Sequence, residues 1–494
     1  MQSIRQSLGK PNGRDERSAL ASYYASATQP LWVGLKGLTP RAKALIAELK
    51  RADDWGLRAA DFDVPQTAAA KPDAKPTDLA DVEVKLGFAA LKYARHARGG
   101  RVDPNAISDN LDRKAQLIPA RDVVAGLAAA SGTDGYLRKL HPQHPQFELL
   151  RIAYMAMRDG KAPVAVTPRV AEPEVKKDGK KKAAEAPEAP LKGSVKKLLA
   201  NMEMWRWMPT DLGATHVFVN VPEFQFRLVR DGAIVHTERV ITGKIITQTP
   251  IFSDTMETVV FKPRWNVPDS IKVKELLPAL YKSRDALAKQ DLKIELNGEP
   301  VDPRQVNWSS TDIRAFHVYQ PSGNANALGV VKFLFPNKHA VYLHDTPTKN
   351  LFNTASRAYS HGCIRIRNPV RFAEVLMEQD KKWSPSQVKA ALAPEAPDDN
   401  HVGLARKFPV HIAYFTATAA DDGQITYYKD IYEYEGNINL GIEGKASQIV
   451  KPPKDVDTPI QAVRRDDPRI SAYERAASKG SGSPDWARTL FGRN

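Results

Sequence analysis

The hydrophobic pattern of this chain changes its period across a stretch rich in lysine, alanine and proline at residues 161–193. Before this stretch apolar residues recur at helical spacing, as in Leu45 and Leu49 after the capping pair Thr39-Pro40. After it apolar and polar residues alternate, which is typical of strands. The stretch itself carries too little apolar surface to bury a core and is predicted to be a disordered linker. The chain is therefore expected to join a helical domain to a β-rich domain.

The predicted fold class is α+β and multidomain. A helical domain is expected at residues 15–160, the linker at 161–193, a mainly-β domain at 194–440 and a polar tail at 441–494. An insertion at 269–328, with a helix-like run around 275–287, interrupts the β domain. Helices are also expected at 81–98, 146–158 and 368–377, the last capped by Asn368. Strands are expected at 216–221, 224–229, 234–241, 331–335, 340–344, 410–416 and 425–428.

Composition narrows the classes of function. The net charge of +15 favours anionic partners or a solvated basic surface, and no nucleic-acid motif is present. No run approaches the roughly 20 apolar residues that span a bilayer, so no transmembrane segment is predicted. The first residues lack the apolar core of a secretory signal, which leaves open a cytoplasmic protein or a signal removed upstream. His141 and His144 lie among prolines and are predicted to form a helix-entry loop rather than a metal site.

The single cysteine excludes an intramolecular disulfide and a thiolate-rich metal site. A lone cysteine is more often a small buried apolar residue than a nucleophile. Here its neighbours change that expectation, because Ser360-His361-Gly362-Cys363 follows His344 by fewer than twenty residues. A nearby imidazole can hold a thiol as the reactive thiolate. Gly362 lets backbone N–H groups approach a substrate carbonyl, as an oxyanion hole requires.

The identity of the general base stays open on spacing alone. His361 and Cys363 are two residues apart, so their side chains point the same way in an extended segment. His344 ends a predicted strand and could reach the thiol from a neighbouring strand.

The run from Leu343-His344-Asp345 to Ser360-His361-Gly362-Cys363 resembles the signature of the L,D-transpeptidase (YkuD-domain) family, in its long Gram-negative YcbB-type branch. Further blocks are similar to that branch over most of residues 15–432. They are Val240-Ile241-Thr242-Gly243-Lys244, Gln248-Thr249-Pro250, Trp265-Asn266-Val267-Pro268, Asn326-Ala327-Leu328-Gly329 and, in the helical part, Gly100-Arg101-Val102-Asp103-Pro104. The resemblance implies a helical scaffold domain, a YkuD-like catalytic domain and an inserted capping subdomain. The small peptidoglycan-binding module that the branch often carries is not expected, because the linker stands in its place.

The resemblance also implies a reaction and a location. Cys363 would attack the third-residue (diaminopimelate) carbonyl of a donor tetrapeptide of peptidoglycan, release D-Ala and hold the acyl group as a thioester. An acceptor amine, on another stem peptide or on an outer-membrane protein, would then receive it in the periplasm. No cofactor or metal is implied.

Roles for individual residues follow from the same resemblance. His344 would be the base and His361 would orient the loop, while Gly362 and Cys363 form the oxyanion hole. The candidate substrate-binding residues are Tyr342, Trp265, Arg357, Arg365 and Ser360. For the two arginines, a purely structural role in the cysteine loop is an equal alternative, and for Trp265 and Tyr342 ordinary core packing is the stronger one.

Two other functions compete with this one. A peptidoglycan L,D-carboxypeptidase or other cysteine hydrolase would form the same acyl-enzyme and pass it to water. Hydrolases of the NlpC/P60 kind place the cysteine before the histidine, whereas here both histidines come first. A non-catalytic wall-binding scaffold would need no thiol beside an imidazole.

Overall fold

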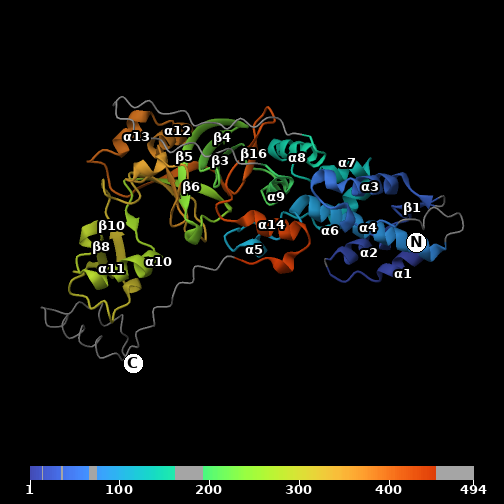
Figure 1. Ribbon diagram of the computed structural model, residues 1–494, viewed down its shortest axis with the longest axis horizontal. Coiled ribbons are helices and arrows are strands. Elements are labelled where there is room, and N and C mark those ends of the chain that lie inside the picture. Colours follow the sequence, from blue (N-terminus) through green and yellow to red (C-terminus); the bar gives the residue numbers. More distant parts are fainter. Residues whose placement is uncertain (14, 35–36, 66–74, 162–192, 452–494) are drawn as a thin grey trace.

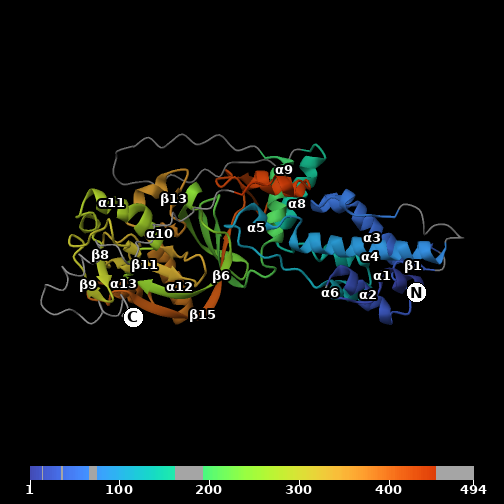
Figure 2. The same cartoon turned by 90° about the horizontal axis from the view of Figure 1, so that it is seen from below.

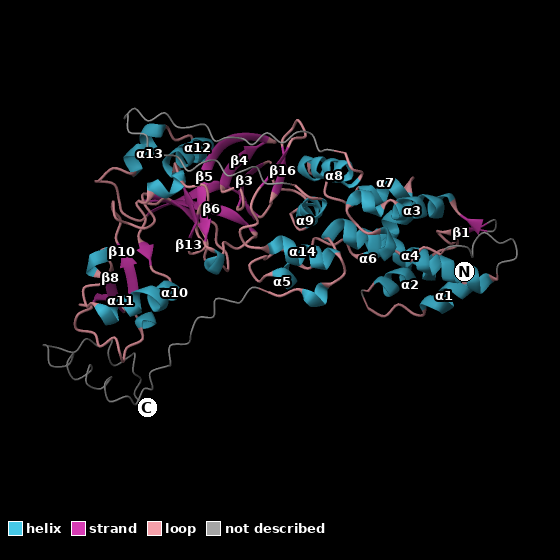
Figure 3. Ribbon diagram, viewed as in Figure 1, coloured by secondary structure: helices cyan, strands magenta, loops and turns pink. Residues whose placement is uncertain are grey.

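The computed structural model describes residues 1–13, 15–34, 37–65, 75–161 and 193–451, drawn in colour in Figure 1. The predicted linker, apart from its end residues, and the tail from residue 452 lie outside them. Helices occupy one end of the molecule, the large sheet lies in the middle, and a small subdomain projects at the other end (Figures 1 and 3).

The N-terminal domain is helical, as predicted. Its helices are α1 (Gln2–Leu8), α2 (Glu16–Ser26), α3 (Pro40–Lys50), α4 (Pro76–Gly99), α5 (Pro104–Ile107), α6 (Ala120–Ala129), α7 (Thr133–Arg138) and α8 (Pro145–Arg158), with a two-residue hairpin of β1 (Val33–Gly34) and β2 (Gly37–Leu38). Helix α4 runs along the length of the domain (Figure 2). Its apolar face is buried in one core with α2, α3 and α6.

Local capping explains where these helices begin. The Thr39 hydroxyl accepts the N–H of Ala42 and Pro40 occupies the first turn, which confirms the predicted start of α3. The predicted helix-entry loop before α8 is confirmed too. His144 caps α8 by accepting the N–H of Gln146, and the His141 ring is fully buried against Trp55.

The central sheet has nine strands in the order β13-β5-β14-β12-β11-β6-β15-β3-β4, and β4 also pairs with β5. That extra pairing links strands near both ends of the order, so the sheet curls on itself. The strands are β3 (Thr215–Asn220), β4 (Gln225–Arg230), β5 (Ala233–Gly243), β6 (Ser253–Phe261), β11 (Val331–Leu334), β12 (Leu343–His344), β13 (Ala358–Ser360), β14 (Ile364–Ile366) and β15 (Asn400–Ala413). Helices α9 (Val195–Arg206), α12 (Pro369–Lys381) and α13 (Pro385–Ala391) and the hairpin β16 (Ala417–Ala419) and β17 (Ile425–Tyr427) complete the domain.

The inserted residues form a separate small subdomain. Its sheet has the order β7 (Trp265–Asn266), β10 (His317–Gln320), β8 (Lys293–Leu296) and β9 (Glu299–Pro300). A continuous helical run of α10 (Asp269–Ile271), a π-helical turn (Lys272–Leu276) and α11 (Leu277–Lys282) packs beside it. These elements share a hydrophobic core that includes Val267, Leu287 and Trp308. The predicted helix around 275–287 was wrong at both ends, since the run begins at Asp269 and ends at Lys282.

Two further expectations need correction. The predicted strand 340–344 is reduced to Leu343–His344, because the Asn337 side chain bonds to Phe335 and Val341 and folds the preceding residues into a turn. Asn368 precedes α12 as predicted, but its side chain does not cap the helix. Its amide instead donates to Glu238 at 2.8 Å.

The start of the predicted tail is also wrong. Helix α14 (Tyr434–Ile442) extends past Gly441, and a 3₁₀ turn follows at Ala446–Gln448. Ile438 and Ile442 are buried in the main core, which holds the segment in place by apolar contact. Residues 441–451 are therefore part of the folded structure. Within the described residues, no helix is both long and apolar enough to cross a bilayer.

Candidate active site

The candidate nucleophile lies where two short parallel strands meet. Strand β12 pairs in parallel with β14 in the register Leu343↔Ile364 and His344↔Arg365. Cys363 directly precedes β14. Because side chains two apart in an extended segment share a face, Tyr342 lies on the same side as His344 of β12, and Cys363 on the same side as Arg365 of β14. His344 ends a strand, as predicted, and that strand lies beside the one that follows the cysteine.

Tyr342 interacts directly with the sulfur of Cys363. Its backbone N–H and its hydroxyl both interact with the Cys363 thiol, and the Trp265 indole hydrogen-bonds to the same hydroxyl. The Tyr342 ring also lies edge-on to the His344 ring, with centroids 5.5 Å apart. The thiol itself donates to the Ala340 carbonyl at 3.8 Å. The structure thus brings together Cys363, His344, Tyr342 and Trp265.

His344 is held in one tautomer. Its Nδ1 donates to the backbone carbonyl of Asp345, which leaves Nε2 as the ring nitrogen with a free lone pair. Burial lowers the pKa of His344 to about 3, and the positive charges of Arg365, Lys332 and Lys349 act in the same direction. The imidazole is therefore neutral throughout the physiological pH range.

His361 has a different environment. Its side chain is exposed, and Nε2 lies 2.5 Å from Glu275 Oε1, in the π-helical turn of the inserted subdomain. This contact ties the cysteine loop to the subdomain. It also directs the ring of His361 toward a carboxylate, whereas the His344 side chain on β12 is buried.

The cysteine loop is fixed by hydrogen bonds from its own residues and from the segment after β5. Ser360 Oγ donates to the Cys363 carbonyl and accepts the N–H of Gly362 at 3.2 Å. Thr249 Oγ1 donates to the Gly362 carbonyl at 2.8 Å. Gly362 has φ 118°, a conformation that favours glycine. Among the described residues no partner is found for the Cys363 N–H, so this amide is available to a substrate oxygen.

The remaining predicted binding residues divide into two groups. Arg365 lies beside Cys363 and His344, acts electrostatically on both, and contacts Thr348 at 3.4 Å. Arg357 instead donates to the carbonyls of Val240, Thr354 and Phe224. Its geometry favours the structural alternative over carboxylate binding. Ser360 is buried and engaged with the loop, so it is not directed toward a ligand either.

Sequence reasoning missed Lys332. This lysine occupies β11, in register with His344, and its Nζ lies 4.4 Å from the centroid of the Tyr342 ring. Burial lowers the pKa of Lys332, while Asp399 and Cys363 act to raise it. The signal was present in the strand Val331-Lys332-Phe333, where one charged residue alternates with two buried apolar ones. Lys332 lies on the same face of the sheet as His344.

The thiol balances opposing influences. The pKa of Cys363 is raised overall, because burial outweighs the Tyr342 hydrogen bonds and the charges of Lys332 and Arg365, which act to lower it. The cations beside the sulfur, rather than an imidazolium, therefore favour the thiolate. Replacing a cation near the sulfur should make the thiolate harder to form.

We expect Lys332→Met to raise the pKa of the Cys363 thiol. The alkylation rate with iodoacetamide, followed against pH, should reach half its maximum at a higher pH than in the wild type, and should fall at pH 7. Lys407→Met is the matched control, because it removes the same charge from an exposed lysine paired with Glu257. An unchanged pH profile for Lys332→Met would show that Lys332 does not influence the Cys363 thiol.

Gly329 supports the strand that carries His344. It has φ 60°, and a Cβ built there would lie 2.2 Å from Asp345 Oδ2, the atom that accepts the Val330 N–H at 3.0 Å. The predicted block Asn326-Ala327-Leu328-Gly329 therefore makes room for the residue after His344.

We expect Gly329→Ala to lower the free energy of unfolding by about 2 to 4 kcal/mol, from backbone strain and the clash with Asp345. Chemical denaturation measures the change. Gly403→Ala is the control, since no atom lies within 4 Å of the Cβ position there. Equal stabilities of the two variants would contradict the expectation.

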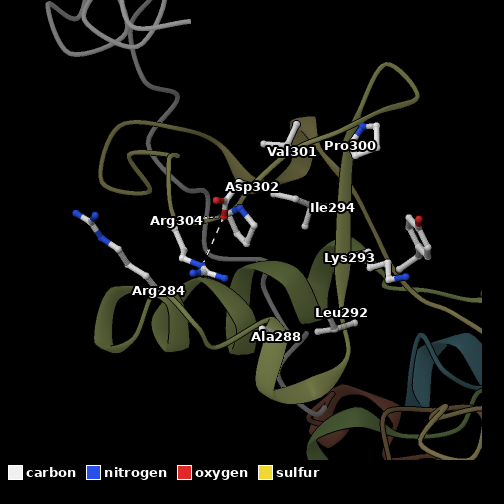
Figure 4. Close-up of a pocket in the computed structure, with 11 residues that line it drawn as sticks. Arg284, Ala288, Leu292, Lys293, Ile294, Pro300, Val301, Asp302 and Arg304 are labelled. Atoms are coloured by element: carbon white, nitrogen blue, oxygen red, sulfur yellow. Dashed lines mark hydrogen bonds and ion pairs between the residues drawn. The ribbon is translucent and has the colours of Figure 1, made fainter. Parts of the chain in front are cut away.

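A hollow of about 430 Å³ opens in the inserted subdomain rather than at the cysteine (Figure 4). Leu292, Ile294 and Val301 line its apolar part. Arg304 on its wall is paired with Asp285 and Asp302, which reduces its positive charge. Size alone is a weak guide to function, and neither Cys363 nor His344 lines this hollow. Within the described residues, no cluster of three or more His, Cys, Asp or Glu is arranged to hold a metal ion.

Comparison with known proteins identifies two domains in the chain. Residues 18–153 match the family model of a scaffold domain, and residues 214–388 match that of the L,D-transpeptidase catalytic domain. A Haemophilus influenzae protein provisionally named an L,D-transpeptidase is 33% identical over 226 residues. The match covers 45% of this chain and 45% of that relative, so the chain spans less than half of its length in the alignment.

Solved structures give more distant matches. An L,D-transpeptidase from Mycobacterium smegmatis is 13% identical with a TM-score of 0.18, over 40% of this chain and 58% of that one. The Mycobacterium tuberculosis L,D-transpeptidase 1 is 14% identical with a TM-score of 0.16, over 40% and 61%. On the family-model matches, the chain carries an L,D-transpeptidase (YkuD) catalytic domain at residues 214–388, preceded by a scaffold domain.

Proposed function

We propose that this protein is a peptidoglycan L,D-transpeptidase that works in the periplasm with Cys363 as its nucleophile. The observation that supports this most is the juxtaposition of a half-buried thiol with a neutral, single-tautomer imidazole on the adjacent parallel strand. A thiol–imidazole pair of this kind is suited to acyl transfer and has no evident use in a protein that only binds the wall.

The first half of the reaction forms the acyl-enzyme. The sulfur of Cys363 attacks the carbonyl of the third (diaminopimelate) residue of a donor tetrapeptide, and its proton passes to Nε2 of His344. The Cys363 N–H stabilises the oxyanion, joined by the Gly362 N–H once it exchanges Ser360 for the substrate oxygen. The peptide C–N bond breaks, His344 returns the proton to the departing amine, and D-Ala leaves.

The second half transfers the acyl group. An acceptor amine attacks the thioester, His344 takes a proton from that amine, and the thiol is restored. Arg365, beside the sulfur, is suited to bind a carboxylate of the stem peptide, and Trp265 and Tyr342 form the wall next to it. The acceptor is a second stem peptide, which would give a 3-3 crosslink, or an amine of a wall-attached protein such as one of the outer membrane.

Incubation with purified disaccharide-tetrapeptide, followed by liquid chromatography and mass spectrometry, tests this function. Release of D-Ala with formation of a crosslinked dimer is expected. Tripeptide without dimer would instead assign an L,D-carboxypeptidase. No product, combined with retained binding to sacculi and no carbapenem adduct on Cys363, would favour a non-catalytic scaffold.

A further inference from the structure

A short segment of the scaffold domain is docked into the catalytic domain. Leu111 forms a parallel β-bridge with Ile251, and the N–H of Ile251 donates to the Asn110 carbonyl at 2.7 Å. The guanidinium of the buried Arg113 donates to the Ile412 carbonyl at 2.7 Å and to Ser253. Residues 110–113, called here the strap, are therefore anchored in the catalytic domain on both sides of Asp112.

The strap touches one support of the cysteine loop. The Asn110 side chain donates to Gln248 Oε1 at 3.2 Å. The next residue, Thr249, is the one whose hydroxyl donates to the Gly362 carbonyl. The strap thus contacts the segment 248–249, which holds the cysteine loop through Thr249.

Asp112 contacts the turn 337–341, whose Ala340 carbonyl accepts the Cys363 thiol. Its Oδ2 lies 2.9 Å from His339 Nε2 and 2.8 Å from Lys338 Nζ. The His339 ring also packs near Phe252, with centroids 5.0 Å apart. Burial acts to raise the pKa of Asp112, but the hydrogen bonds and charges of Lys338 and His339 outweigh it and hold the pKa below its ordinary value. The carboxylate is therefore charged and held in place.

The turn that Asp112 grips leads directly to the nucleophile. Ala340 has φ 53°, a conformation that residues other than glycine seldom adopt, so its surroundings must hold it. Its carbonyl accepts the Cys363 thiol at 3.8 Å, and Tyr342, two residues later, interacts with the same sulfur. Asn337 closes the turn by accepting the N–H groups of His339 and Val341.

We propose that Asp112 is a positioning residue supplied by the scaffold domain, which acts through His339 to hold the turn 337–341 against the sulfur of Cys363. The scaffold domain is then a component of the active centre and not only a wall-binding or spacing element. This inference rests on the proposed function for its catalytic readout, but its effect on the thiol can be measured without any peptidoglycan.

The first experiment compares Asp112→Ala, Asp112→Asn and the control Asp109→Asn in the full chain. Asp109 lies on the approach to the strap and pairs with Lys451 instead. Asp112→Ala should lower kcat for the donor tetrapeptide by about 10- to 100-fold with KM nearly unchanged, since displacement of a reacting group costs rate rather than binding. Asp112→Asn keeps an acceptor for His339 and should restore part of the rate, while Asp109→Asn should match the wild type.

The second experiment reads the thiol directly. Alkylation of Cys363 by iodoacetamide should be slower at pH 7 in Asp112→Ala, with its midpoint moved to higher pH, because the turn no longer keeps Tyr342 on the sulfur. A double-mutant cycle that combines Asp112→Ala with His339→Ala then tests whether Asp112 acts through His339. The double variant should be no slower than the slower single variant if Asp112 acts through His339.

Three results would overturn the proposal. They are a folded Asp112→Ala protein with wild-type kcat and alkylation, losses that multiply in the double variant, and a loss in Asp109→Asn equal to that in Asp112→Ala. If Asp112→Ala fails to fold, the same comparison is made with His339→Ala, in which a wild-type alkylation profile overturns the proposal, because the contact with Asp112 is then absent. A wild-type protein that makes no crosslink would sink the proposed function, while the alkylation series would still decide the role of Asp112.

Discussion

Cys363→Ala is expected to reduce crosslinking of disaccharide-tetrapeptides by at least about 10³-fold, because the thioester intermediate can no longer form. The chain contains a single cysteine, so no second thiol can substitute. The rate of dimer formation, measured by liquid chromatography, gives the loss directly.

The fold should survive this change. The Cys363 side chain is half-buried, and the loop around it is held by Ser360 and Thr249 through backbone groups that alanine retains. Circular dichroism and the midpoint of thermal unfolding should therefore match those of the wild type. Crosslinking that persists in a folded Cys363→Ala protein would rule out the nucleophile and the mechanism with it.

His344→Ala is expected to slow acylation by about 10²- to 10⁴-fold, the range typical of the loss of a general base. The lone pair of its Nε2 is free because Nδ1 donates to the Asp345 carbonyl, and the buried ring stays neutral with a pKa of about 3. The folded protein should keep this base unprotonated as the pH falls from 8 to 5. A single-turnover assay with a carbapenem, followed by mass spectrometry, measures the rate.

His361→Ala is the matched comparison. The exposed pair of His361 with Glu275 contributes little, so acylation should fall by no more than about fivefold. Glu275→Gln should resemble His361→Ala, because both remove the same contact. If His361→Ala proves the more damaging of the two histidine variants, the base has been assigned to the wrong residue.

Much of the fold could be predicted from local patterns. The helix after Thr39-Pro40, the cap before Pro145 and the alternating strands near residues 215–243 depend on neighbouring residues, and periodicity reports such neighbours. The turn before His344 could not be predicted in this way. Its residues alternate like a strand, but the Asn337 side chain closes them into a turn that the strap contacts from a distant part of the chain.

The site shows the same division. The sequence by itself predicted Cys363 as the nucleophile, because one cysteine follows a glycine and two histidines in a family signature, and chemistry of this kind depends on residue type and short spacing. Only the tertiary structure decided which histidine lies on the strand beside Cys363 and that Arg357 binds backbone carbonyls. It alone also placed Lys332 against the Tyr342 ring and Asp112 against His339. These are contacts between segments tens to hundreds of residues apart. They arise from strand register and domain docking, which no local pattern encodes.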